Sequence, residues 1–137
     1  QRLGENILKL CDFVTPNEIE AEQITGIPVK SINDAEIAAG KLLEKGAKAA
    51  VITLGEQGAL FKDKNQVIHQ PSYEVGPVVE TTGAGDAFNG GLAVALAEEM
   101  PIDKALRFAC ATASISVTRQ GTAPSMPDRN EIEILLK

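Results

Sequence analysis

The sequence predicts an α/β fold in which helices cover a largely parallel sheet. Three observations indicate this class. Residues 49–54 (AAVITL) form a continuous apolar segment, typical of a strand buried on both faces of a parallel sheet. Expected strands alternate with expected helices along the 137 residues. Two short strands around the turn-forming residues 63–65 (DKN) predict one antiparallel hairpin beside the parallel part.

Two helices are expected before the buried strand. A short strand over residues 12–15 is followed by Asn17, which can cap a helix that runs to Thr25. A second helix is expected over residues 34–45, with Asp34 as its cap. Its apolar face is formed by Ile37, Ala38, Leu42 and Leu43.

The remaining elements follow from turn and cap signals after the buried strand. In chain order they are hairpin strands over residues 59–62 and 66–70, a strand over 74–79, helices over 85–99 and 102–117, and a final helix that starts at the capping-box-like Asp128-x-x-Glu131. No repeat, low-complexity segment or internal linker interrupts this order, so residues 1–137 are expected to belong to one domain.

The composition fits a globular α/β domain and disfavours several functions. Hydrophobic residues make up 44% of the chain, enough to close a core. The formal net charge of −6 disfavours nucleic acid or an anionic membrane as partner, because both require clustered cations. Cys11 and Cys110 form no disulfide framework, and the single histidine, His69, excludes most Ser-His-Asp chemistry. His69 itself is interpreted as a surface residue on a strand. The longest apolar run, residues 92–97, is too short for a membrane span, and we expect a cytoplasmic protein.

The clearest chemistry lies in residues 81–86 (TTGAGD), which lead into the expected helix over 85–99. The small residues Gly83, Ala84 and Gly85 let backbone N–H groups approach an anion, and the helix N-terminus adds partial positive charge there. Asp86 lies in the first turn of the same helix. Phosphoryl transfer to an alcohol needs this combination, because amides stabilise charge on the transferring group while a carboxylate orients and deprotonates the hydroxyl.

Other interpretations of this loop remain open from the residues alone. It could be a tight turn, with Asp86 only complementing the helix dipole. A dinucleotide-binding G-x-G-x-x-G fingerprint is disfavoured, because Phe88 occupies the third glycine position and no βαβ unit surrounds the loop. A nicotinamide-dependent oxidoreductase would need that fingerprint. The Walker pattern is absent as well, since Gly40-Lys41 is followed by Leu42 inside a helix.

Residues 78–96 (VVETTGAGDAFNGGLAVAL) resemble the signature of the ribokinase family of carbohydrate kinases, D-T-x-G-A-G-D. The resemblance implies that Asp86 is the catalytic base, which contacts the sugar hydroxyl. It also implies that Gly83, Ala84 and Gly85 form the anion hole. One position departs from the pattern: Glu80 stands where the family usually has Asp. In the family, that residue helps to hold a monovalent cation.

Two further motifs match the same family. Asn17 and Glu20 reproduce its N-x-x-E motif, which implies that Asn17 contacts a phosphate of ATP and Glu20 holds a water bound to Mg²⁺. Thr53, Gly55 and Gly58 reproduce its T-x-G-x-x-G loop, which implies ATP binding. Without the resemblance, these motifs would be a helix cap with a solvated acidic face and an ordinary turn.

The segment over residues 110–127 (CATASISVTRQGTAPSMP) also resembles ribokinases. The resemblance implies that Cys110 flanks the adenine of ATP; a reactive thiol is disfavoured because Cys110 lies on an apolar helix face. It further implies a site for a monovalent cation such as K⁺. The expected contributors are Glu80, Thr82, Ser116, Arg119, Gly121 and Ser125.

The resemblance covers essentially all 137 residues, but only part of a typical family member. It therefore implies the C-terminal part of a ribokinase-like three-layer sandwich, with the ATP site and the catalytic base but without the sugar-binding part and lid. The implied reaction is ATP-dependent phosphorylation of a sugar hydroxyl, most naturally of D-ribose, with Mg²⁺ and K⁺ as cofactors. Other expectations are that this chain alone is inactive and that the full-length protein forms a homodimer. Alternatives are fructokinase, another sugar or nucleoside kinase, or a non-catalytic nucleotide-binding fragment.

Overall fold

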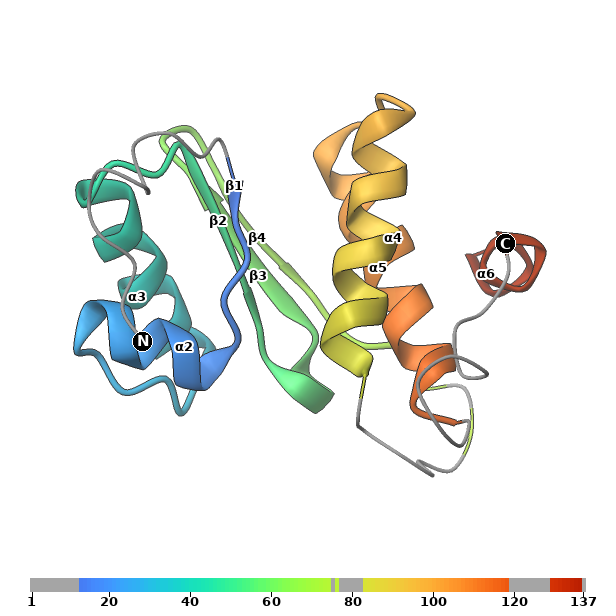
Figure 1. Cartoon of the computed structure of the whole chain (residues 1–137), viewed down its shortest axis with the longest axis horizontal. Helices are drawn as coiled ribbons and strands as arrows, with labels where there is room; N and C mark the ends of the chain where they lie inside the picture. Colours follow the sequence, from blue (N-terminus) through green and yellow to red (C-terminus); the bar gives the residue numbers. More distant parts are fainter. Residues whose placement is uncertain (1–12, 75, 77–82, 119–128, 137) are drawn as a thin grey trace. The chain divides into compact units, whose positions relative to one another are not determined.

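The described residues form a mixed α/β structure, which confirms the expected class. A computed structural model describes residues 13–74, 76, 83–118 and 129–136. The chain divides into two compact units, residues 1–70 and 71–137. In chain order the elements are β1 (Phe13–Val14), α2 (Glu18–Thr25), α3 (Ile32–Glu44), β2 (Ala49–Thr53), the 3-10 helix η1 (Gly55–Gln57), β3 (Ala59–Asp63), β4 (Val67–Gln70), α4 (Ala84–Ala97), α5 (Ile102–Ser116) and α6 (Arg129–Leu136) (Figure 1).

The sheet lies in the first unit, with the strand order β1-β2-β3-β4. Strands β1 and β2 are parallel, whereas β2–β3 and β3–β4 are antiparallel. Within the described residues the sheet is therefore mixed, and the expectation of a mostly parallel sheet is not met there. The cause is the length of the connections: short turns join β2 to β3 and β3 to β4, whereas a parallel neighbour requires a crossover such as α2 and α3.

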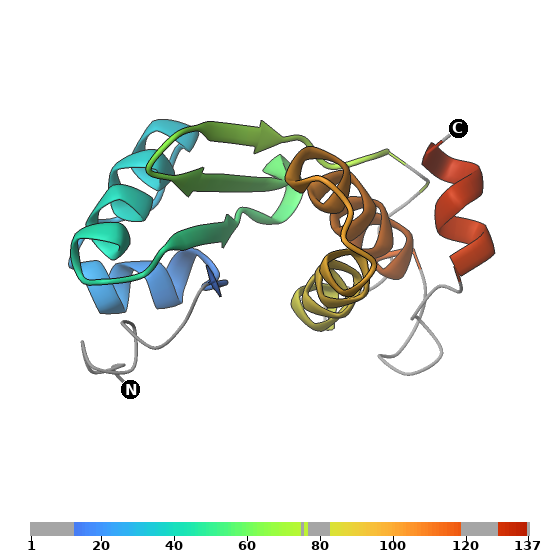
Figure 2. The same cartoon turned by 90° about the horizontal axis from the view of Figure 1, so that it is seen from above.

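Helices α2 and α3 cover one face of this sheet (Figures 1 and 2). Their core includes Leu42 of α3 and the strand residues Ala50, Ile52 and Leu60, each fully buried. Val51 points to the opposite face, because side chains alternate along a strand, and it is also fully buried. Strand β2 is thus buried on both faces, as its continuous apolar sequence predicts.

Helix α3 begins earlier than expected. Its cap is Ser31, whose hydroxyl accepts a hydrogen bond from the Asp34 N–H at 3.1 Å. Asp34 therefore lies in the first turn, where its carboxylate accepts from the Lys30 N–H at 3.0 Å. The expected apolar face is also wrong at Ile37, which is 52% exposed. The residues that α3 buries are Ala35, Ala38, Ala39 and Leu42.

The second unit is helical in its described part. Helices α4 and α5 pack side by side, joined by residues 98–101. Gly91 permits this packing, because a Cβ at this position would lie 2.7 Å from Thr112 Oγ1 and 3.2 Å from the Ala109 Cα. Helix α6 starts with Arg129, which stacks over the Phe108 ring at 5.4 Å from its centroid.

Most expected boundaries lie within a few residues of the observed ones. Two expectations fall largely or partly outside the described residues. Of the strand expected over 74–79 only Glu74 and Gly76 are described, and neither lies in a strand. The expected cap Asp128 is not described, although α6 follows directly after it. Among the described helices, none is both long and apolar enough to cross a membrane.

Candidate functional site

The N-terminus of α4 has the properties of an anion site. Its N-cap, Gly83, has φ +91°, a left-handed conformation that glycine adopts without strain, and no side chain of the described residues caps the helix. The first internal bond runs from the Ala87 N–H to the Gly83 carbonyl at 2.9 Å. The amides of Gly83, Ala84, Gly85 and Asp86 precede that bond and have no acceptor within the helix. They are the donors that an anion would use.

Space around this turn is open on the side of Gly85. A Cβ built there meets no atom of the described residues within 4 Å. Asp86 is exposed in the same turn, while the next residues, Ala87 and Phe88, are buried and hold the helix in place. The structure thus brings together the predicted anion-hole residues and the predicted base. A carboxylate beside free helix amides can act on a hydroxyl whose phosphoryl donor is held by those amides.

The first unit brings its two predicted nucleotide motifs together at the carboxyl ends of β1 and β2. Asn17 forms a parallel bridge with Thr53, and the Thr53 N–H donates to the Pro16 carbonyl at 3.1 Å. Glu18 lies there too, with Oε1 3.9 Å from the place of a Cβ at Gly55. The N-x-x-E pattern does not point to Glu18, because that residue occupies one of its two unspecified positions. Ligands of open α/β sheets bind at this edge.

The N-x-x-E residues form a complete capping box at the start of α2. Asn17 Oδ1 accepts from the Glu20 N–H at 2.8 Å, and Glu20 Oε1 accepts from the Asn17 N–H at 3.0 Å. Each side chain uses one polar atom in the box. The Asn17 amide nitrogen and Glu20 Oε2 lie outside it, on exposed residues. Capping and ligand binding are therefore compatible in this motif.

The T-x-G-x-x-G loop is a tight turn built on two left-handed glycines. Gly55 has φ +57° and Gly58 has φ +91°, and the Leu54 N–H donates to the Gly58 carbonyl at 2.8 Å. His69 Nε2 lies 2.7 Å from the Gln57 carbonyl oxygen of the same turn. The interpretation of His69 as a surface residue is thus incomplete: it lies on a strand as expected, but it is half-buried and hydrogen-bonded. No sequence pattern links residues 57 and 69.

Cys110 lies within α5 and is 3% exposed. Burial raises the pKa of its thiol to about 12, which favours the protonated form at neutral pH and agrees with the interpretation of Cys110 as a buried, unreactive thiol. Its expected place beside adenine stays a prediction. A contact that sequence reasoning missed lies on the same helix: the Tyr73 N–H donates to Ser114 Oγ at 3.0 Å. This bond ties the segment before the glycine loop to α5.

Only part of the expected cation sites can be located. Glu20 is exposed on α2, and Ser116 is 1% exposed at the end of α5. The other expected residues lie outside the described ranges; they are Glu80, Thr82, Arg119, Gly121 and Ser125. In the part of the chain that the structure describes, no three His, Cys, Asp or Glu side chains gather as a metal site. A magnesium ion held through water would rely on Glu20 without such a cluster.

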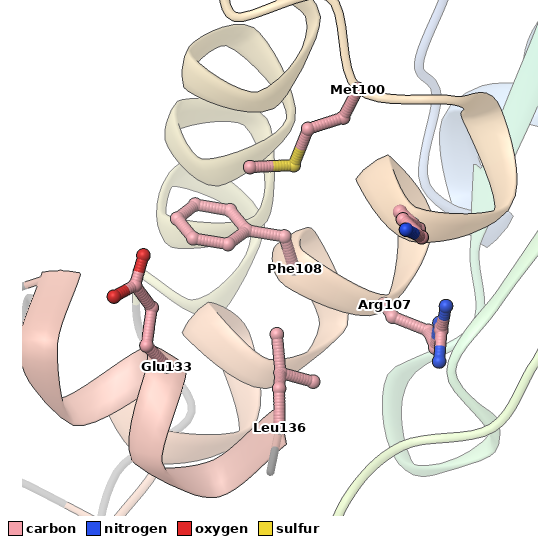
Figure 3. A pocket seen from close by; sticks show the side chains of 6 residues that line it. Met100, Arg107, Phe108, Glu133 and Leu136 are labelled. Atoms are coloured by element: carbon pink, nitrogen blue, oxygen red, sulfur yellow. The ribbon is translucent and has the colours of Figure 1, made fainter.

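A pocket of about 270 Å³ lies in the second unit, between α5 and α6 (Figure 3). Met100, Phe108 and Leu136 supply its apolar wall, and charged side chains flank it. None of the residues predicted for phosphate, nucleotide or cation binding lines it. The candidate functional residues therefore lie at the β1–β2 edge in the first unit and at the α4 N-terminus in the second, each considered by itself, rather than in this pocket.

A helix N-terminus with a carboxylate in its first turn is an arrangement that suits proteins that bind phosphate. The sequence profile of the pfkB family carbohydrate kinases matches residues 1–129, and the chain belongs to this family. Among curated relatives, the ribokinase of Haemophilus influenzae is 42% identical over 133 residues, covering 96% of this chain and 42% of the relative. A deoxyribokinase of Salmonella typhi is 40% identical over 117 residues, covering 85% of this chain and 38% of the relative. The chain thus spans less than half the length of these relatives.

Solved structures confirm the ribokinase-like fold. Arabidopsis thaliana ribokinase, complexed with ribose and ATP, superposes with a TM-score of 0.95 at 36% identity, covering all of this chain and 44% of that one. An E. coli protein described as ribokinase II, complexed with ATP and Mg²⁺, superposes with a TM-score of 0.83 at 31% identity. The match covers 96% of this chain and 41% of that one. E. coli phosphofructokinase-2, complexed with potassium, superposes with a TM-score of 0.82 at 28% identity. This match covers 96% of this chain and 42% of that one.

Proposed function

We propose that this chain is the ATP-binding and catalytic part of a sugar kinase that transfers the γ-phosphoryl group of ATP to a sugar hydroxyl. The observation that carries the proposal is the start of α4. Gly83 is left-handed, no side chain in the described part of the chain caps the helix, and Asp86 is exposed in the first turn. In this role residues 1–137 supply the C-terminal part of the kinase domain.

Asp86 acts as the general base in the proposed reaction. Its carboxylate accepts the proton of the attacking hydroxyl as the oxygen bonds to the γ-phosphorus and the bond to the β-phosphate oxygen breaks. The amides of residues 83–85 donate to the oxygens of the transferring group, where charge is concentrated. The helix holds base and donors in one turn, so they need no rearrangement relative to each other.

ATP is positioned by the edge residues of the first unit and by α5. Asn17 donates its side-chain amide to a phosphate oxygen, and the turn formed by Thr53, Gly55 and Gly58 offers backbone groups along the nucleotide. Cys110, buried in α5, contributes apolar contact beside the adenine. The Arabidopsis relative in complex with ribose and ATP supports both ligands.

The residues proposed for Mg²⁺ and those proposed for K⁺ differ in how much of each site the structure describes. Glu20 presents an exposed carboxylate with one oxygen outside its capping box, which suits a water-mediated contact with Mg²⁺. When bound, the magnesium ion would neutralise charge on the phosphates. A potassium site would use Ser116 together with Glu80, Thr82, Arg119, Gly121 and Ser125. The potassium complex of E. coli phosphofructokinase-2 supports this part.

D-Ribose is the proposed acceptor, and 2-deoxyribose is the second candidate. Relatives named ribokinase and deoxyribokinase match this chain at similar identity, 42% and 40%. The Arabidopsis neighbour holds ribose, which favours the first.

A calorimetric titration of the folded chain with Mg·ADP, with NADH as the control ligand, tests the proposal. Saturable, magnesium-dependent ADP binding without NADH binding is the expected result. NADH binding would mean that the glycine loop belongs to a dinucleotide site. Failure of the folded chain to bind ADP would contradict the assignment of the nucleotide site to this chain.

A further inference from the structure

We propose that His69 is a positioning residue for the nucleotide: its imidazole holds the η1 turn in the shape that presents Gly55 and Gly58 to ATP. The inference rests on the proposed function, because it assigns a nucleotide to that turn. It starts from one contact, the 2.7 Å approach of His69 Nε2 to the Gln57 carbonyl oxygen.

The direction of this hydrogen bond follows from the acceptor. A carbonyl oxygen can only accept, so Nε2 must carry the proton. The neutral imidazole is then the Nε2–H tautomer. The imidazolium form donates from the same atom, so the bond persists in both protonation states.

The hydrogen bond from His69 reinforces the main-chain bonds of the turn. These include Leu54 N–H to the Gly58 carbonyl at 2.8 Å, Gln57 N–H to the Leu54 carbonyl at 3.0 Å, and Gly58 N–H to the Gly55 carbonyl at 3.1 Å. Both glycines are left-handed, and glycine loses more conformational freedom on ordering than any other residue.

Strand β4 places His69 where it can reach the turn. His69 pairs with Leu60 across the β3–β4 ladder, one residue from the end of β3 that adjoins η1. Leu60 is fully buried in the core beneath α2 and α3. Directly opposed residues share a face of the sheet, so the side chains of His69 and Leu60 project from the same face. The backbone at His69 is therefore anchored by its pairing with a strand of the core. A bond from there to Gln57 limits movement of the turn relative to the sheet.

Two variants and one control separate this role from general stability. His69→Phe removes the donor but keeps a flat ring, whereas His69→Gln retains an N–H donor of similar reach. Val67→Ala alters the same strand on the same face, two residues away from His69. Only His69→Phe should disturb the turn.

The first readout uses the fact that the chain contains one histidine. In a tag-free, isotope-labelled sample at pH 8, a long-range ¹H–¹⁵N spectrum therefore reports a single imidazole. We expect the Nε2–H tautomer, together with faster amide exchange at Leu54, Gln57 and Gly58 in His69→Phe only. An Nδ1–H tautomer, or identical exchange in all variants, would overturn the proposal.

The second readout is the affinity for Mg·ADP. Loss of one neutral hydrogen bond predicts affinity weaker by about 3- to 10-fold in His69→Phe, with His69→Gln and Val67→Ala within about 2-fold of the unaltered chain. Equal affinity of His69→Phe and the unaltered chain overturns the role of His69 and leaves the proposed function intact. Absence of ADP binding by the unaltered chain overturns both.

Discussion

Helices α2 and α4 begin in opposite ways, although both start at a predicted phosphate-binding motif. The first turn of α2 is closed by its own side chains, since Asn17 and Glu20 bond to each other's backbone N–H groups. The first turn of α4 receives no cap from a side chain within residues 13–74, 76, 83–118 and 129–136, and its N-cap is a left-handed glycine. Amides that a protein leaves uncapped remain available to a ligand. The difference favours α4 for the proposed anion hole and α2 for the proposed side-chain contact with the nucleotide.

The two units also differ in how their helices pack. Helix α3 lies on the sheet through side chains such as Leu42. Helices α4 and α5 instead approach through Gly91, where a single added carbon would overlap Thr112. The helix that carries the proposed anion site is thus held by a contact that leaves no room for an added carbon at Gly91.

The largest expected effect is on catalysis at the open helix. In a kinase that combines this chain with a sugar-binding part, Asp86→Asn should lower kcat by about 10²- to 10⁴-fold, because the amide cannot accept the hydroxyl proton. The affinity for Mg·ADP should hardly change, since the helix amides remain. Steady-state kinetics and titration check both parts. Turnover close to that of the unaltered enzyme would remove Asp86 as the base.

The packing difference predicts opposite signs for one substitution in the two units. Gly91→Ala should destabilise by about 1–3 kcal/mol, because the new Cβ overpacks the contact with Thr112. Gly40→Ala in α3 is the matched control: its Cβ would lie 3.8 Å from the Lys62 side chain, an ordinary contact. Helix propensity then favours Ala by about 1 kcal/mol.

Urea denaturation of both variants measures these changes. A Gly91→Ala chain as stable as the unaltered chain would mean that α4 and α5 are not in such close contact. The double variant Gly91→Ala/Thr112→Ala should recover part of the loss, because it removes the nearest clashing atom.

The capping box allows its two proposed roles to be separated. Asn17→Ala should cost about 1 kcal/mol of stability, because it removes the acceptor for the Glu20 N–H. Asn17→Asp keeps an acceptor and should retain stability, yet it should weaken Mg·ADP binding by placing a negative charge beside the phosphates. Denaturation and titration of the pair provide the check. Equal ADP affinity in Asn17→Asp and the unaltered chain would restrict Asn17 to capping.

The smallest effect is expected at the other end of α4. Glu99 has φ +60°, and its N–H and that of Met100 donate to the carbonyls of Leu96 and Ala95 at 3.0 Å, which closes the helix end in a Schellman motif. Glycine is the usual residue there. Glu99→Gly should therefore stabilise by about 0.5–1 kcal/mol, measured by thermal unfolding. A loss of stability would show that the Glu99 side chain makes a contact worth more than the backbone strain.

Local signals predicted most of the elements and the chemistry at the two motifs. Turn residues located the hairpin, and the run of apolar residues in β2 predicted a strand buried on both faces. Boundaries were less accurate where two residues competed for one role. Ser31 caps α3 instead of Asp34 because a hydroxyl three residues earlier can accept the Asp34 N–H. Ile37 was wrongly assigned to the core, since periodicity alone does not say which face meets the sheet.

The sequence by itself determined the α/β class, the α4 loop with its aspartate, and the family resemblance that the comparisons confirm. These depend on residues close together in the chain, whose spacing and backbone preferences are local. Only the tertiary structure decided that Asn17 bridges Thr53, that Gly91 meets Thr112 and that His69 bonds to Gln57. Such contacts join residues far apart in the chain. They depend on strand order and on how the helices pack, which no local pattern encodes.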